Sequence, residues 1–587
     1  MRRSPSFRGP RFVLVVVGVL LVGGLSASTL GATIGLDLSY VDTQSVAWQR
    51  FVAWVDQALD GTPPYGFTAT DAVTVYRVTG QSAYAQLAIA TVEAQVSEAE
   101  GFIAIGQVPP IAGDQYLESG PWIHDVALVY AWCYPVLTAQ QRSRWAAYAE
   151  QTVWNLWHHG QASWGGVAHP WPGWGVDDPG NNYHFSFLEA TMFWGLASDS
   201  PTWLALLEDE KLPALTAYWA QLSGGGSREG TGYGLALMRL FELYRLWRDS
   251  TSVDLGVRSS HLADTIDYWI HATVPTLDRY APIGDLARES YPWLYDYHRR
   301  LVLEARAMAV APAVRERASW WLHHIAIDEM TSGFNLRHDL LPAGVTETAP
   351  TALVHHAVGA GHLFARTGWG SDATWISFVA GRYDQSHAHQ DQGSFNLFHG
   401  DFLAVSEYVF SHSGIEQGTE QHNLVRFDRA GVPITQLPGT TSSLAVQAGA
   451  SWTRLVADLT AAYGAGRGVN LWQRTVELSG TGLLLDDRFV VDPDVEAVFQ
   501  LNLPVEPTIA GGVVTVPGFR LVPLLPRGAT ATVVSWHTVD PQEYSTGWRL
   551  ELRGAGSRFA VRLLLPGVLQ VDGFETGGLE AWPAQRP

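Results

Sequence analysis

The sequence contains very little cysteine and lysine. Among its 587 residues there is one cysteine, Cys133, and one lysine, Lys211, so arginine supplies almost all of the 37 basic side chains. A single cysteine excludes an internal disulfide. Because Cys133 lies in the apolar run "VALVYAWCYPVL", we expect a small buried side chain and not a nucleophile.

Charged residues are also scarce, at 16% of the chain, and their balance is acidic, with a formal net charge of −20. An acidic chain argues against nucleic acid or an anionic membrane surface as a partner. It does not exclude an anionic substrate, because screening over about 8–10 Å lets a cleft be locally positive. Apolar residues make up 47%, which is typical of a globular protein, and the length suggests roughly two to four domains.

The only long apolar run lies near the N-terminus. Four arginines among the first 11 residues precede an apolar stretch over residues 12–25, and small residues follow. This pattern predicts a signal peptide over residues 1–32 and therefore export to the periplasm or the extracellular space. The stretch is shorter than the roughly 20 residues that span a bilayer, so we expect cleavage and no membrane association of the mature protein.

The rest of the chain divides into a helical block and a strand-rich block. Between residues 41 and 324, apolar residues recur at three- and four-residue spacing, as in "SVAWQRFVAWVDQAL", and breaks rich in Gly, Pro and Asp separate the helices. Paired helices of this kind indicate a solenoid or a toroid. Beyond residue 350 the pattern alternates with period two, which indicates an antiparallel sandwich. We predict an α+β multidomain protein, with a helical solenoid or toroid over residues 33–340 and an antiparallel β-sandwich with a short C-terminal tail over residues 341–587.

One segment, "YDQSHAHQDQGSFNLFHGDFLAVSEY" (residues 383–408), concentrates proton- and metal-binding groups. In a strand, His387, His389 and Asp391 would lie on one face. An exposed polar strand is the simpler interpretation of two such histidines. The other is a metal site, because His422 of "QHN" and Glu407 of "LAVSEY" would add ligands of the kind that Zn²⁺ takes.

The same segment, with "GHLFARTGWGSDATWISFVAG" before it and "HNLVRF" after it, resembles the C-terminal domain of the heparinase II/III-like polysaccharide lyases. In the helical block, "GNNYHFSF" is similar to the Asn/His segment of that family, "GGGSREGTGYG" to its Glu-Gly-x-x-Tyr segment, and "APIGDLARES" to a further loop. These pieces follow the family's order over most of residues 40–490. The resemblance implies an incomplete (α/α) toroid joined to an antiparallel β-sandwich, and cleavage of an anionic, uronate-containing polysaccharide by β-elimination.

Elimination requires three kinds of group. Hydrogen-bond donors neutralise the uronate carboxylate, a base removes the adjacent proton, and an acid protonates the departing O4. The resemblance implies that Asn182 holds the carboxylate, with Asn181 and His184 as neighbouring candidates, although an asparagine there would also suit a helix cap. It implies Tyr233 as the acid, and as the base in a syn elimination. His387 would be a base or a partner of the carboxylate.

Two residues just before Tyr233 are further candidates. Arg228 and Glu229 would bind substrate, or would pair with each other in a solvated loop.

Two other functions stay open. A glycoside hydrolase needs two carboxylates roughly 5–10 Å apart, for which Asp177, Asp178 and Glu229 are available. A polysaccharide-binding protein without activity would keep the architecture alone.

The resemblance also implies a metal site in the β block. His389 and His422 would be ligands, and the family's third ligand is an acid whose spacing falls near Ser406. Glu407, one position later, is the nearest acid. We expect any Zn²⁺ there to organise the β domain without taking part in proton transfer, and we expect no organic cofactor.

Overall fold

The computed structural model describes residues 34–286 and 291–566. The predicted signal peptide and the predicted C-terminal tail lie outside the described residues. Within the described ranges, no helix has the length and apolarity that crossing a membrane requires. All described residues belong to one compact unit.

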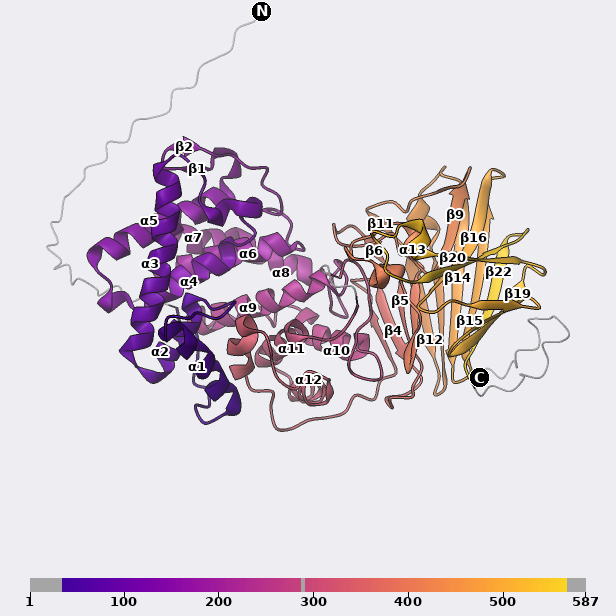
Figure 1. The fold of residues 1–587 in the computed structure, drawn as a ribbon, viewed down its shortest axis with the longest axis horizontal. Helices are drawn as coiled ribbons and strands as arrows, with labels where there is room; N and C mark the ends of the chain where they lie inside the picture. Colours follow the sequence, from indigo (N-terminus) through magenta and orange to yellow (C-terminus); the bar gives the residue numbers. More distant parts are fainter. Residues whose placement is uncertain (1–33, 287–290, 567–587) are drawn as a thin grey trace, which may run out of the picture. The chain divides into compact units, whose positions relative to one another are not determined.

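The first part of the described chain is helical, as the three- and four-residue spacing predicts (Figure 1). Its α-helices are α1 (Val46–Leu59), α2 (Ala69–Thr79), α3 (Ser82–Ala104), α4 (Ser119–Trp132), α5 (Ala139–Trp157), α6 (Asn182–Ser198), α7 (Pro201–Leu206), α8 (Leu212–Trp219), α9 (Leu237–Thr251), α10 (His261–Ala272), α11 (Asp296–Met308) and α12 (Pro312–His324). Helix α2 lies in the predicted helical block although its composition does not favour a helix. Its sequence, "ATDAVTVYRVT", is rich in β-branched residues, which lower helix propensity, and packing against α3 and α4 overrides that preference.

Helix α6 is the central helix of this part. Nearly every side chain from His184 to Ala197 is buried, and α6 contacts α4, α5, α7 and α9. A helix that is apolar on all sides must be surrounded by others, which explains its place in the core. Its two ends, at Asn182 and Ser198, are only partly buried.

The second part consists of antiparallel sheets, which confirms the predicted β-sandwich. One sheet has the strand order β12-β13-β14-β15-β22-β19-β18-β17, a second has β10-β9-β16-β21-β20, and a third has β3-β4-β5-β7-β8. The two short pairs are β1 with β2 and β6 with β11. The strand bounds are β1 (Ser163–Trp164), β2 (Val167–Ala168), β3 (Val354–Ala357), β4 (His362–Arg366), β5 (Trp375–Val379), β6 (Arg382–Tyr383), β7 (Phe395–His399), β8 (Asp401–Ala404), β9 (Val425–Arg429), β10 (Val432–Pro433), β11 (Thr440–Thr441), β12 (Ser443–Ala448), β13 (Trp452–Asp458), β14 (Val469–Ser479), β15 (Gly482–Val491), β16 (Val495–Leu503), β17 (Thr508–Ala510), β18 (Val513–Val516), β19 (Phe519–Leu525), β20 (Thr530–Ser535), β21 (Trp548–Arg553) and β22 (Arg558–Leu564).

The sheets share one apolar core. Burial alternates along β13 and β14, as expected for strands with one face inward. The buried apolar residues on one face of β4, β5 and β7 form one cluster with those of β9, β14, β16 and β21, and those on the other face, such as Phe364 and Trp375, belong to the core of the helical part. The three large sheets are therefore layers around a common interior.

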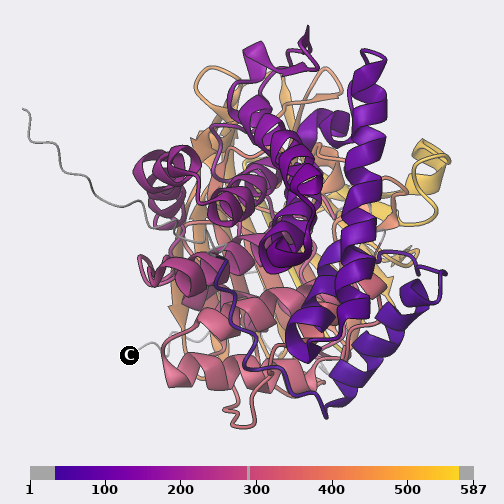
Figure 2. The ribbon, with the colours of Figure 1, turned by 90° about the vertical axis from the view of Figure 1, so that its left-hand side faces the viewer.

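Helix α10 joins the helical part to the sheet β3-β4-β5-β7-β8. The hydroxyl of Tyr268 on α10 donates a hydrogen bond to Nδ1 of His362 on β4, at 2.7 Å. Arg366 and Trp375, on β4 and β5, donate to the backbone carbonyl of His271. Figure 2, seen from the helical side, shows the helices in front of the sheets. The last helical turn before the large sheets ends at Leu340, and the next strand begins at Val354. The division into domains at residue 340 stays a prediction.

The strand predicted for the histidine segment is wrong. After the two-residue strand β6 the chain leaves the sheet and returns as β7 at Phe395, so His387, His389 and Asp391 lie on a loop. Glu407 is not on a strand either, because it begins a 3₁₀ turn, Glu407–Phe410, after β8. The period-two spacing was fortuitous here, since the backbone of this loop pairs with residues 285 and 417 and makes local turns, instead of forming a strand ladder.

Candidate functional site

Tyr233 and His387 are in direct contact. Their rings are stacked, with centroids 3.5 Å apart and planes 4° from parallel. Tyr233 begins a 3₁₀ turn, Tyr233–Ala236, that precedes α9, whereas His387 comes from the loop between β6 and β7. The fold thus brings together two predicted site residues that are 154 positions apart in the numbering.

Close backbone packing positions this tyrosine. A Cβ atom at Gly230 would lie 2.0 Å from the carbonyl oxygen of Ile283, and Gly230 has a φ of +90°. Only glycine suits such a position. The hydroxyl of Thr231 donates to the carbonyl of Ala281 at 2.7 Å. The loop that carries Tyr233 is therefore fixed against residues 281–285.

Asp285 connects that segment to both histidines. Its Oδ2 accepts a hydrogen bond from Nδ1 of His387 at 2.7 Å, and its Oδ1 accepts one from Nε2 of His389 at 2.8 Å. Burial alone would raise the pKa of Asp285, but the hydrogen bonds from His387 and His389 hold it below its usual value. Because Nδ1 of His387 donates to a carboxylate, Nε2 is the nitrogen of the neutral ring that can accept a proton.

A buried ion pair fixes the two ends of the histidine region. The guanidinium of Arg474 on β14 donates to the backbone carbonyls of Gly393 at 2.7 Å and Asn423 at 2.9 Å. Asp487 on β15 pairs with the same guanidinium through two hydrogen bonds, at 2.8 and 2.9 Å. Gly393 ends the loop that carries His387, and Asn423 follows His422. Each charge of this buried pair therefore has hydrogen-bond partners, as buried ions require.

The two asparagines at the start of α6 have different surroundings. Asn181 is the N-cap, and its side-chain oxygen accepts from the backbone N–H of Tyr183 at 3.0 Å. The side-chain oxygen of Asn182 is buried and has no hydrogen-bond partner among the described residues. The capping alternative therefore applies to Asn181. Asn182 is left available for a ligand.

His184 lies one turn further into α6. Its Nδ1 is 3.0 Å from the carbonyl oxygen of Gly175 and donates to it. Burial lowers the pKa of His184 to about 4, and the nearby charge of Lys211 acts in the same direction. The ring is therefore neutral near pH 7, and its Nε2 is a hydrogen-bond acceptor. A neutral acceptor does not suit the neutralisation of a carboxylate.

Arg228 and Glu229 do not form the ion pair that was one interpretation of them. Arg228 is buried, donates to the carbonyl of Gly359 at 3.1 Å and pairs with Asp384 at 3.3 Å. Glu229 is also buried. Burial raises its pKa well above the usual value, and the charges of Asp178 and Asp285 raise it further.

The carboxylate of Glu229 is therefore close enough to Asp178 and Asp285 for their charges to act on it. Asp178 belongs to the loop before Asn182, and Asp285 holds His387. The turn that begins at Tyr233 contacts α6 as well as α9. The segments around residues 182, 233 and 387 thus lie in one region of the molecule.

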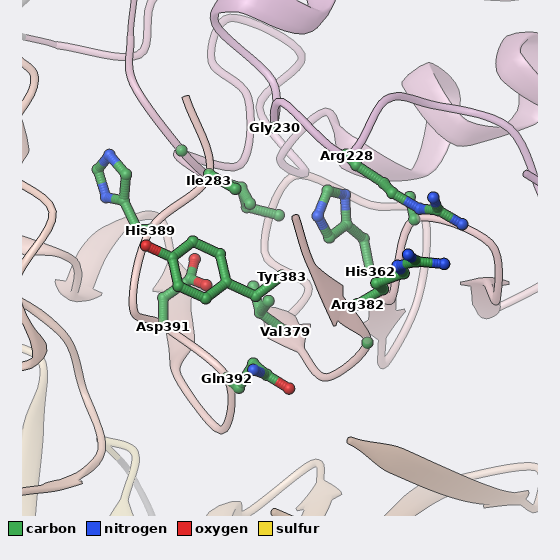
Figure 3. Close-up of a pocket in the computed structure, with 14 residues that line it drawn as sticks. Arg228, Gly230, Ile283, His362, Val379, Arg382, Tyr383, His389, Asp391 and Gln392 are labelled. Carbon is green, nitrogen blue, oxygen red and sulfur yellow. The ribbon is translucent and has the colours of Figure 1, made fainter. Parts of the chain in front are cut away.

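A cavity lies beside this region and not at the ring stack. Of the predicted site residues, Arg228 and His389 line it. Figure 3 shows Arg228 and Arg382 on one side of the cavity, with His389 and Asp391 on the other. Burial raises the pKa of Asp391 to about 7.

The described residues do not complete the predicted zinc site. The rings of His389 and His422 are 5.1 Å apart between centroids, and the hydroxyl of Ser406 is 2.9 Å from Nδ1 of His422. Ser406 thus contacts His422 from the position where the resemblance implies an acid. The side chain of Glu407 lies outside the described part of the chain. Two imidazoles and a hydroxyl are fewer and weaker ligands than structural zinc takes.

Another cluster has the spacing of a cation site. Among the described residues, Glu242, Glu304 and His338 place ligand atoms within 4.8 Å of one another. Arg245 pairs with Glu304 through two hydrogen bonds, at 2.8 and 3.0 Å, and Arg300 pairs with Glu242 at 2.7 Å. These arginines already supply the positive charge that a cation would bring.

Comparison with known proteins identifies the fold. No family model matches the chain, and no curated protein matches its sequence. A heparan sulfate lyase from Pedobacter heparinus, HepC, is 15% identical with a TM-score of 0.58, and the match covers 90% of this chain and 85% of that one. A heparinase III structure is 14% identical with a TM-score of 0.55, over 85% and 76% of the two chains. The chain has the fold of these lyases.

A chondroitin AC lyase from Streptomyces coelicolor A3, solved with chondroitin sulphate, has the same architecture. It is 11% identical, with a TM-score of 0.54 over 89% of this chain and 80% of that one. The predicted (α/α) toroid followed by an antiparallel β-sandwich is confirmed, and the resemblance is confirmed at the level of the fold.

Proposed function

We propose that the protein is a polysaccharide lyase that cleaves a uronate-containing polysaccharide by β-elimination. The observation that carries this proposal is the stack of Tyr233 on His387, with Asp285 orienting the imidazole, within a fold shared with polysaccharide lyases. An acid and a base in contact, drawn from different segments, suit a reaction that removes one proton and delivers another.

In the proposed reaction His387 is the base. Its Nε2 takes the proton from C5 of the uronate, the electron pair forms a C4–C5 double bond, and the C4–O4 bond breaks. Tyr233 protonates the departing O4. The hydrogen bond from Nδ1 to Asp285 selects the tautomer in which Nε2 accepts, and it stabilises the imidazolium that forms.

The carboxylate of the uronate is proposed to bind at the N-terminus of α6. There the side-chain amide of Asn182 is adjacent to the positive end of the helix dipole, which favours an anion. Glu229, whose raised pKa favours the protonated form, would donate a second hydrogen bond. Neutralising the carboxylate makes the adjacent proton acidic enough to be removed.

The proposal extends to location and metal. We propose that the protein is exported, on the basis of the predicted signal peptide, and that its partner is an anionic polysaccharide. Zinc binding by His389, His422 and Glu407 stays a prediction that depends on Glu407. No step of the proposed reaction passes through a metal.

One assay tests the reaction class. The purified protein is incubated with a panel of uronate polymers while ultraviolet absorbance and reducing ends are followed. A lyase produces both, because the new double bond absorbs. A glycoside hydrolase would produce reducing ends without absorbance, and a binding protein would produce neither.

A further inference from the structure

The hydroxyl of Tyr218 is a buried polar group that the proposed reaction does not use. Tyr218 lies near the end of α8, and its hydroxyl oxygen has no hydrogen-bond partner among the described residues. Burial is the main reason that the pKa of Tyr218 is raised, so the group stays protonated. A buried hydroxyl without a partner destabilises a folded protein relative to phenylalanine at the same position.

The backbone makes room for this hydroxyl at the start of the asparagine segment. A Cβ atom at Gly180 would lie 2.3 Å from the hydroxyl oxygen of Tyr218, and Gly180 has no left-handed φ. Glycine is therefore required there for close approach alone. Because Gly180 directly precedes Asn181 and Asn182, the Tyr218 hydroxyl lies against the loop that would bind the uronate.

A second buried polar atom without a partner in the described part of the chain belongs to Asp384, which pairs with Arg228. The guanidinium of Arg228 is 5.8 Å from the ring centroid of Tyr218 and 3.3 Å from Oδ2 of Asp384. The other carboxylate oxygen of Asp384, Oδ1, is buried and has no hydrogen-bond partner among the described residues. Within the described ranges, Arg228 therefore lies close to two residues, Tyr218 with an unpartnered donor and Asp384 with an unpartnered acceptor.

These two atoms match the chemistry of a sugar hydroxyl. A hydroxyl group both accepts and donates, so it can accept from Tyr218 and donate to Asp384. We infer that Tyr218 and Asp384 bind a hydroxyl group of the sugar chain, between the asparagine segment and Arg228, and so position the chain for cleavage. This inference rests on the proposed function and adds a binding residue, Tyr218, to it.

The substitution Tyr218→Phe tests the inference, with Tyr463→Phe as the matched control. Tyr463 is buried in the core of the sheets, away from this loop. Loss of one hydrogen bond between neutral groups predicts a KM about three- to tenfold higher for Tyr218→Phe, with kcat changed by less than about twofold. The unfolding temperature should be equal to that of the wild type or higher, because the unpartnered hydroxyl is gone. The control should leave KM unchanged.

Two results would overturn the inference: an unchanged KM, or a raised KM together with a lower unfolding temperature, which would indicate a structural role. A second measurement separates it from the proposed function. Calorimetry with uronate tetrasaccharides compares Tyr233→Phe with Tyr233→Phe/Tyr218→Phe. Suppose that the wild type does not cleave any of the polymers, and that the double variant binds a tetrasaccharide more weakly than Tyr233→Phe does. The proposed reaction is then wrong, and the binding role of Tyr218 stands. Equal affinity, or no binding by either variant, rejects the role of Tyr218.

Discussion

Nδ1 of His387 donates a hydrogen bond to Oδ2 of Asp285 at 2.7 Å, across 102 positions of sequence. The same carboxylate accepts from His389, so one side chain orients two imidazoles of the loop between β6 and β7. This hydrogen bond fixes the tautomer of the neutral His387 ring, so that Nε2 is the nitrogen that accepts a proton. Asp285 was not among the predicted site residues, although the loop "APIGDLARES" that contains it was part of the resemblance.

We predict that Asp285→Asn lowers kcat by about 10²-fold or more, because an amide cannot accept both hydrogen bonds and would favour the wrong tautomer of His387. Initial rates of absorbance increase measure this. Asp486→Asn is the control, since Asp486 likewise accepts two hydrogen bonds, which come from Arg558 at 2.7 and 2.8 Å. Equal activity of the two variants would rule out an orienting role for Asp285.

The two asparagines at α6 should separate stability from catalysis. Asn181→Ala removes the N-cap and should lower the free energy of unfolding by about 1 kcal/mol. Asn182→Ala should lower kcat/KM by at least about tenfold, because it removes a donor to the substrate carboxylate, and it should leave stability nearly unchanged. Denaturant titration and initial rates measure the two effects. The reverse pattern would transfer the carboxylate-binding role to Asn181.

The burial of His362 predicts a dependence of stability on pH. Burial lowers the pKa of His362 to about 3. Between pH 6.5 and 3 the unfolded chain binds a proton at this histidine and the folded chain does not. This residue therefore makes the protein less stable as the pH falls, by about 1.4 kcal/mol per pH unit well inside that range.

The variant His362→Gln tests this, because glutamine keeps an acceptor for Tyr268 and does not titrate. Between pH 6 and 4 the free energy of unfolding should fall by about 1.4 kcal/mol less per pH unit in the variant than in the wild type. Urea denaturation at several pH values measures both slopes. Parallel slopes would show that His362 titrates alike in the folded and unfolded chains.

Removal of metal should not stop the reaction. The proposed proton transfers use Tyr233 and His387, and His387 takes its orientation from Asp285. Dialysis against a chelator should therefore change kcat by less than about twofold, while metal analysis before dialysis reports whether zinc is bound. If activity were lost on dialysis and returned with zinc alone, the metal would have a direct role.

The helices and strands were largely predictable because their apolar periodicity reflects burial. The histidine segment was found from its own concentration of proton- and metal-binding groups, whereas the asparagine and tyrosine segments were found through the family resemblance. The contacts of Asp285 and Tyr218 were not found, because they arise where separate elements meet. Sequence spacing carries no signal for a hydrogen bond across 102 positions. The loop of His387 was misread as a strand because alternate histidines imitate period two.

The substitution Tyr233→Phe tests the central claim most directly. It removes the proposed acid and retains the ring that stacks on His387, so the fold and substrate binding should persist. On the polymer that the wild type cleaves, the rate of ultraviolet absorbance increase should fall by about 10²- to 10⁴-fold. A variant that forms the unsaturated product at the wild-type rate would contradict the account.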